Sequence, residues 1–125
     1  MSPAILIIDR QVAVRQIMQQ ALRKIGYKTA VVDNPHQALV LLNKYEFHAV
    51  ILDDDLEGMR GGQLCRQIKR QPATKHIPVV IASESLRIVN PDYVKATGAD
   101  IALLKPVSAD KVCEAIESLL RTKTV

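Results

Sequence analysis

The sequence AVILDDD, residues 49–55, carries the pattern that decides the fold. Four apolar residues run without alternation and end at three consecutive aspartates. A strand that is apolar on both faces is expected to be buried on both faces, which requires helices above and below a parallel sheet. The aspartates then lie at the carboxyl end of that strand, the edge where open parallel sheets bind their ligands.

Apolar runs of the same kind recur along the chain. The five predicted strands are Ala4–Ile8, Thr29–Val32, Ala49–Leu52, Val79–Ala82 and Ile101–Leu104. The intervals have the apolar spacing of helices. Three of these helices are expected to start at Asn34-Pro35, Asn90-Pro91 and Ser108. Two are expected to end at Gly26 and Gly98. Gly58, Gly61 and Gly62 are expected to be turn residues before the third helix. The alternation predicts an α/β fold of (βα)5 type, a doubly wound, flavodoxin-like five-stranded parallel sheet with strand order 2-1-3-4-5.

Length and composition predict one domain, residues 1–125, with an aliphatic core, because 48% of the residues are apolar and only 3% are aromatic. No apolar run approaches the ~20 residues that span a bilayer, and Ala4–Ile8 lacks the features of a signal peptide. We therefore expect a cytoplasmic protein.

The basic residues that give the net charge of +4 are scattered along the chain, so nucleic-acid binding is not expected. Cys65 and Cys113 lack metal-ligand spacing and are expected to be small buried residues.

Four of the predicted strands are followed by residues whose side chains have complementary chemistry. They are Asp9 and Arg10, then Asp53, Asp54 and Asp55, then Ser83 and Glu84, and finally Lys105 and Pro106. Clustered carboxylates can hold Mg²⁺, and a strand-end aspartate can be a nucleophile toward a phosphoryl donor. A lysine and a hydroxyl can then bind the oxygens of the phosphate.

Taken together, these motifs resemble the response-regulator receiver family, similar to the chemotaxis regulators, over the whole chain. The matching stretches are Leu6–Asp9, Val50–Asp53, Gly58–Gly61, Pro78–Ser83, Gly98–Asp100 and Leu104–Pro106. The resemblance implies a two-component signalling module that is not an enzyme. It implies that Asp53 is the phosphoacceptor, Ser83 the switch hydroxyl and Lys105 the phosphate-binding residue, joined to Pro106 by a cis bond.

The same resemblance implies an Mg²⁺ site and a set of partners. The metal ligands are Asp9, Asp53 and the backbone carbonyl of Asp55. A histidine kinase or phosphotransfer protein is the expected phosphoryl donor. A protein target or a second copy is expected on the face of the fourth helix, fifth strand and fifth helix, which includes Tyr93, Lys95, Ala102, Lys111 and Glu114.

Three residues depart from the family pattern. Arg10 replaces the second acid of the metal site, so Mg²⁺ binding is expected to be weak or absent, and Arg10 is expected to turn at least partly toward Asp53. Glu84 replaces a small residue next to the switch hydroxyl, where it either crowds the entrance or points outward. Ala102 replaces the aromatic residue of the usual switch.

Three interpretations remain open from the sequence. Asp53 is phosphorylated with a degenerate metal site, or the domain is a pseudo-receiver that is never phosphorylated and acts through protein contacts. The remote alternative is a phosphatase of haloacid-dehalogenase type using Asp53 and Asp55, but that pattern belongs on a first strand and here follows the third.

Overall fold

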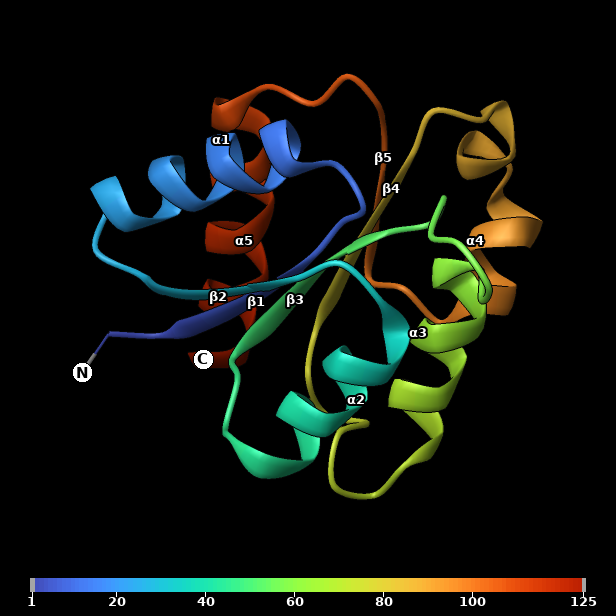
Figure 1. Ribbon diagram of the computed structural model, residues 1–125, viewed down its shortest axis with the longest axis horizontal. Coiled ribbons are helices and arrows are strands. Elements are labelled where there is room, and N and C mark those ends of the chain that lie inside the picture. Colours follow the sequence, from blue (N-terminus) through green and yellow to red (C-terminus); the bar gives the residue numbers. More distant parts are fainter. Residues whose placement is uncertain (1, 125) are drawn as a thin grey trace.

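Five strands form one parallel sheet in the order β2-β1-β3-β4-β5 in the computed structural model, which describes residues 2–124 (Figure 1). The strands are β1 (Ala4–Ile8), β2 (Lys28–Val32), β3 (Ala49–Asp53), β4 (Val79–Ser83) and β5 (Ile101–Leu104). The helices are α1 (Val12–Lys24), α2 (Pro35–Lys44), α3 (Gly61–Arg70), α4 (Pro91–Thr97) and α5 (Ala109–Thr124), with a 3₁₀ helix η1 (Leu86–Val89). The predicted fold class and strand order are confirmed.

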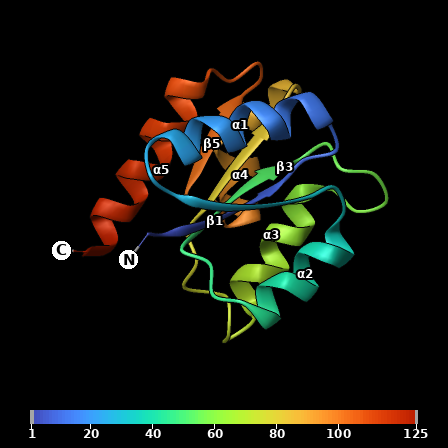
Figure 2. The same ribbon diagram turned by 60° about the vertical axis from the view of Figure 1, so that its left-hand side comes forward.

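Two apolar cores lie on opposite faces of the sheet. Successive strand residues point to opposite sides, so Ile5 and Ile7 pack with residues of α1 and α5, whereas Leu6 and Ile8 pack with residues of α2 and α3. Figure 2 shows α1 and α5 together on one side and α2 and α3 on the other. This double cover explains why the central strands are continuous apolar runs.

The predicted capping residues start three of the helices. The side chains of Asn34, Asn90 and Ser108 accept hydrogen bonds from backbone N–H groups in the first turns of α2, α4 and α5, at 2.9, 2.9 and 3.1 Å. Gly98 ends α4 in the left-handed conformation. These local signals fix where α2, α4 and α5 begin and where α4 ends.

Strands β3 and β4 extend one residue further than predicted. Asp53 pairs in register with Ala82, and Ser83 pairs with Leu104. The two polar residues are therefore the last members of the sheet rather than loop residues, so the ladder fixes their backbone. Strand β2 begins one residue earlier, at Lys28, and η1 was not predicted at all.

The prediction that Gly61 and Gly62 are turn residues is wrong, because both lie in the first turn of α3. A Cβ atom on Gly61 would lie 2.7 Å from Asp54 Cα and would clash with the carbonyl oxygen of Asp53. On Gly62 the nearest atoms are side-chain atoms, with Thr97 Cγ2 at 2.9 Å. Glycine allows the first turn of α3 to lie directly against the end of β3.

The remaining predictions on the scaffold have mixed outcomes. The Lys105–Pro106 bond is cis, as the resemblance implied. Cys65 is buried, and burial raises the pKa of its thiol to about 12. The prediction of burial is wrong for Cys113, which is only half-buried because it lies at the edge of the core under α5. None of the helices described is long and apolar enough to cross a membrane.

We predict that Gly61→Ala destabilises the domain more than Gly62→Ala. Backbone atoms crowd the first site and cannot move aside, so we expect a loss of about 3 kcal/mol, at the upper end of overpacking costs. The second site faces side chains that can adjust, and the loss should be about 1 kcal/mol. Urea unfolding followed by circular dichroism measures both, and equal losses would contradict the close backbone contact at Gly61.

Candidate functional site

The ends of β1, β3 and β5 bring two carboxylates and one ammonium group together. Lys105 Nζ donates hydrogen bonds to Asp9 Oδ2 at 3.0 Å and to Asp53 Oδ1 at 3.1 Å. All three side chains are buried, at 5% exposure or less. Buried carboxylates require paired charge or hydrogen bonds, and Lys105 supplies both to each acid.

The second oxygen of Asp53 faces Arg10. Arg10 donates its backbone N–H to Asp53 Oδ2 at 3.3 Å, and its Nε lies 3.6 Å from the same oxygen. The Arg10 side chain is 38% exposed, so it is partly turned inward. The backbone N–H of Asp55 donates to Asp53 Oδ1 at 2.8 Å. Each oxygen of Asp53 therefore contacts a cation of the same chain.

Burial and pairing oppose each other at Asp9 and Lys105. Burial raises the pKa of Asp9, the N–H of Gln11 opposes this with a hydrogen bond of 2.9 Å, and the nearby charge of Asp53 adds to the rise. Burial also disfavours the charged form of Lys105, but the two carboxylates outweigh it and raise its pKa above the usual 10.5. Lys105 therefore stays protonated at neutral pH.

The carboxylate of Asp55 has a role that the sequence did not reveal, since the resemblance concerned only its backbone carbonyl. Asp55 Oδ1 accepts hydrogen bonds from Ser83 Oγ at 2.9 Å and Arg87 Nη2 at 2.6 Å, and Oδ2 accepts one from the Glu84 N–H at 3.0 Å. Burial acts to raise the pKa of Asp55, but these hydrogen bonds outweigh it and lower the pKa. The predicted switch hydroxyl is thus engaged by Asp55.

Asp54 turns away from Asp53 and is fully buried. Its Oδ1 accepts a hydrogen bond of 2.7 Å from the N–H of Gly62, and its Oδ2 accepts hydrogen bonds from Arg87 Nε at 2.8 Å and the Tyr93 hydroxyl at 2.7 Å. Arg87 therefore pairs with both carboxylates that follow Asp53 and offsets one of their two negative charges. The ion pair of Arg10 is with Asp53 rather than with Asp54 or Asp55.

Sequence reasoning missed Arg87 because it lies on η1, which carries no strong helix pattern. The available signal was one of charge: three consecutive aspartates follow β3, and Arg87 is the first cation after the neighbouring strand β4. Adjacent parallel strands end at the same edge of the sheet. A cation there is the expected partner for acids that cannot all face Lys105.

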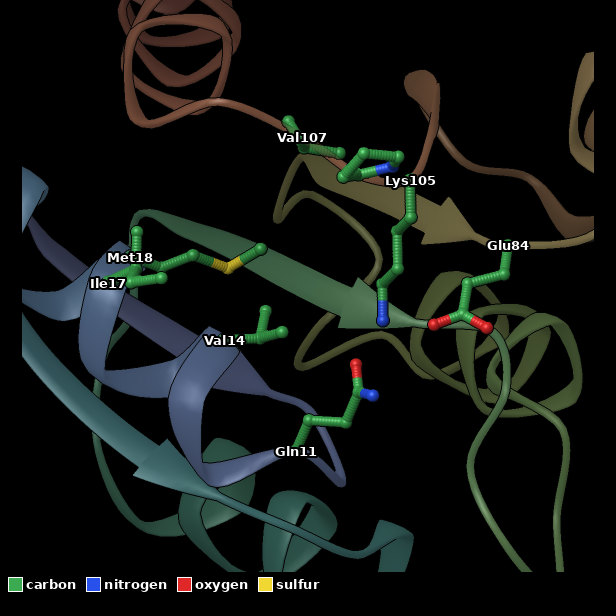
Figure 3. A pocket seen from close by; sticks show the side chains of 8 residues that line it. Gln11, Val14, Ile17, Met18, Glu84, Lys105 and Val107 are labelled. Carbon is green, nitrogen blue, oxygen red and sulfur yellow. The ribbon is translucent and has the colours of Figure 1, made fainter.

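A pocket of about 270 Å³ lies beside the site, between α1 and the loop after β5 (Figure 3). Its lining residues are Gln11, Val14, Ile17, Met18, Glu84, Lys105, Pro106 and Val107. Glu84 is exposed and places a carboxylate on the same pocket as Lys105. Ala102 is half-buried, packs against the core under α3 and offers no ring to the site.

Comparison with known proteins tests the resemblance directly. The sequence profile described as "Response regulator receiver domain" matches residues 5–117. The chain belongs to this receiver family. Receiver domains are in general signalling domains without catalytic turnover of their own.

Curated relatives of several lengths match this chain. The sensory/regulatory protein RpfC of Xanthomonas campestris is 31% identical over 94% of this chain, which spans 16% of that protein. The chemotaxis protein CheY of Pseudomonas aeruginosa is 28% identical, with 92% of this chain and 94% of that protein covered. The phosphate regulon regulator PhoB of Pseudomonas aeruginosa is 28% identical, and the chain spans about half of it (51%).

Solved structures give the same fold. The chemotaxis response regulator CheY4 of Vibrio cholerae superposes with a TM-score of 0.88 at 22% identity, covering 96% of this chain and 100% of that one. A putative response regulator of Chloroflexus aurantiacus gives 0.89 at 25% identity, with 97% and 99% covered. The receiver fold is thereby established, whereas the roles of Asp53, Ser83, Lys105 and Asp9 stay predictions.

We predict that Asp55→Asn lowers stability in a pH-dependent way. The folded-state pKa of Asp55 is lowered, so its stabilising contribution is present above its usual pKa of 3.8 and is lost as the pH falls through the lower folded value. At about pH 7 we expect a loss of about 1–3 kcal/mol. Unfolding of both proteins should be compared between about pH 7 and pH 3.

The matched control is Asp110→Asn, which changes an exposed carboxylate in the first turn of α5. Its effect should be small over the same pH range, because exposed charges contribute little. A difference between wild type and Asp55→Asn that stays constant down to the lowest pH would contradict the lowered pKa.

Proposed function

We propose that this receiver domain works with Asp53 held as an ion-paired carboxylate and signals through protein contacts, with Mg²⁺-dependent phosphotransfer weak or lost. One observation carries the proposal: both oxygens of Asp53 already face cations of the chain, Lys105 at 3.1 Å and Arg10 at 3.6 Å. Two carboxylates and two cations balance the formal charge of the pocket. Such a pocket has little attraction for a further cation.

The residues at this edge of the sheet do not fit Mg²⁺ well. Mg²⁺ requires near-octahedral oxygen ligands and is usually held by carboxylates. Asp9 Oδ2 and Asp53 Oδ1 both bond Lys105, and Arg10 stands where a further carboxylate is expected. Among residues 2–124, no three carboxylate, histidine or cysteine side chains converge as a metal cluster. We therefore include weak or absent Mg²⁺ binding in the proposal.

The second candidate is a receiver that is still phosphorylated on Asp53. It is favoured by the position of Lys105, whose Nζ touches both acids at the predicted phosphate site. In this version Arg10 supplies the positive charge that Mg²⁺ would otherwise bring. Ser83 would have to leave Asp55 before it could reach a phosphoryl oxygen, because a hydroxyl has a single proton to donate.

The proposed partners follow from these two versions. A histidine kinase or phosphotransfer protein is the donor if Asp53 is phosphorylated, and a protein target or a second copy uses the α4-β5-α5 face in either version.

A phosphatase of haloacid-dehalogenase type is disfavoured because the Asp55 carboxylate accepts three hydrogen bonds within the domain, so we propose no enzymatic turnover. A cytoplasmic location stays a prediction.

We predict that Mg²⁺ binds wild type too weakly to saturate at millimolar concentration, and that Arg10→Asp binds it at least about tenfold more tightly. Removing a cation and adding a carboxylate changes two unit charges near the metal, each worth on the order of 1–4 kcal/mol. Titration followed by backbone amide chemical shifts measures the affinity. Arg10→Ala, which removes charge without adding a ligand, should fall between the two.

A saturable millimolar or tighter Mg²⁺ site in wild type would contradict the proposal. So would equal affinities of Arg10→Asp and Arg10→Ala, because the carboxylate would then add nothing as a ligand.

We also predict that wild type gains little or no phosphoryl group from acetyl phosphate and Mg²⁺, whereas Arg10→Asp gains one. The variant regains the acid that positions the metal beside Asp53. Intact-protein mass spectrometry detects the adduct, which should be absent from Arg10→Asp combined with Asp53→Asn. An adduct on wild type that Asp53→Asn abolishes would reject this version and support the second candidate.

A further inference from the structure

A network of polar side chains connects the Asp53 end of the sheet with α4. It runs from Ser83 through Asp55 to Arg87, and from Arg87 through Asp54 to Tyr93. The four side-chain hydrogen bonds measure 2.6–2.9 Å. The residues come from β4, the loop after β3, η1 and α4, so the network joins segments that are far apart in the sequence.

Arg87 is the central member of this network. Its guanidinium uses Nε for Asp54 and Nη2 for Asp55, and its Cζ lies 5.8 Å from the centre of the Tyr93 ring. A planar guanidinium can hold two acceptors in fixed directions, which the compact ammonium of a lysine cannot reproduce. Because Asp54 is fully buried and Arg87 is the cation that pairs with it, the geometry of these contacts is tightly constrained.

The Ser83 hydroxyl is fixed by the same contacts. It donates its proton to Asp55 Oδ1 at 2.9 Å and accepts the N–H of Ser85 at 2.9 Å. The oxygen that accepts this hydrogen bond, Asp55 Oδ1, also accepts one from Arg87. Any change that turns the hydroxyl away from Asp55 leaves Arg87 as the remaining side-chain partner of that oxygen, which alters the charge balance between Asp55 and Asp54.

We propose that Arg87 is a positioning residue for the Ser83 hydroxyl and that, through Asp54 and Tyr93, it couples the Asp53 site to helix α4. This inference deepens the proposed function, on which it rests for taking Asp53 as the centre of the site. It supplies a route to α4, part of the face proposed for partner binding, in a domain where Ala102 has no ring to turn. Tyr93 is half-buried, so a change in its hydrogen bond to Asp54 alters a surface that a partner can contact.

The test uses Tyr93 as its own reporter. In protein labelled with ¹³C-tyrosine, the Cζ resonance of Tyr93 reports on the hydrogen bond of its hydroxyl, and Tyr93→Phe assigns it. Ser83→Ala removes the hydroxyl that donates a hydrogen bond to Asp55. We expect this change to shift the Tyr93 resonance and to leave unchanged that of Tyr45, which lies at the end of α2. In an Arg87→Lys background most of that shift should disappear.

Two controls separate coupling from a merely structural role. Arg70→Gln removes an exposed cation at the end of α3, and the response of Tyr93 to Ser83→Ala should persist there. Asp55→Asn breaks the route on its other side, and the response should be lost there as well. If Arg87 only stabilised the fold, Arg87→Lys, which keeps the charge, would leave the response intact.

Two results would overturn the inference: no shift of Tyr93 in Ser83→Ala, or an equal shift with Arg87 and with lysine at that position. None of these variants changes Asp53, Arg10 or Lys105, and the measurement requires no phosphoryl group or Mg²⁺. Failure of the coupling is therefore distinguishable from failure of the proposed function.

Discussion

One buried ammonium group, Lys105 Nζ, holds two buried carboxylates within 3.1 Å at the end of the sheet. Asp9 and Asp53 would repel each other in this low-dielectric environment, and one would have to take up a proton. Lys105 removes that conflict, and because it directly follows β5 it also ties together the ends of three strands. Removing one partner of such buried groups typically costs about 3–5 kcal/mol, so the position of Asp53 depends on this contact.

The same requirement explains how three consecutive aspartates can follow one strand. Lys105 can approach Asp53 but cannot also pair with the two residues that follow it. Asp54 and Asp55 turn to the other side and share Arg87, whose two nitrogens lie 2.8 and 2.6 Å from their oxygens. The carboxylates of Asp54 and Asp55 are thus paired with Arg87 rather than with the cations that contact Asp53.

The sequence was sufficient for the fold because its signals were local and agreed with one another. Uninterrupted apolar strands such as Val50–Leu52 require cover on both faces, and Asn34, Asn90 and Ser108 start helices by bonding their own first turns. Asp9, Asp53, Ser83 and Lys105 could be placed at one edge because parallel strands end together. Tyr93 could not be placed there, and for Arg87 the balance of charge was the one available signal. The partners of both residues depend on which way Asp54 turns, and no local pattern encodes that choice.

Arg10 brings a second cation to Asp53, at the position where the family resemblance implies a metal-binding acid. An Mg²⁺ ion exchanges with solvent, whereas a guanidinium is a permanent charge of the chain. Arg10 Nε lies 3.6 Å from Asp53 Oδ2, beyond hydrogen-bond distance. The backbone N–H of Arg10 donates a hydrogen bond of 3.3 Å to the same oxygen. The guanidinium therefore acts on Asp53 through its charge rather than through a hydrogen bond. In the proposed function, Lys105 and Arg10 together supply the positive charge that a metal would otherwise bring to the buried Asp53.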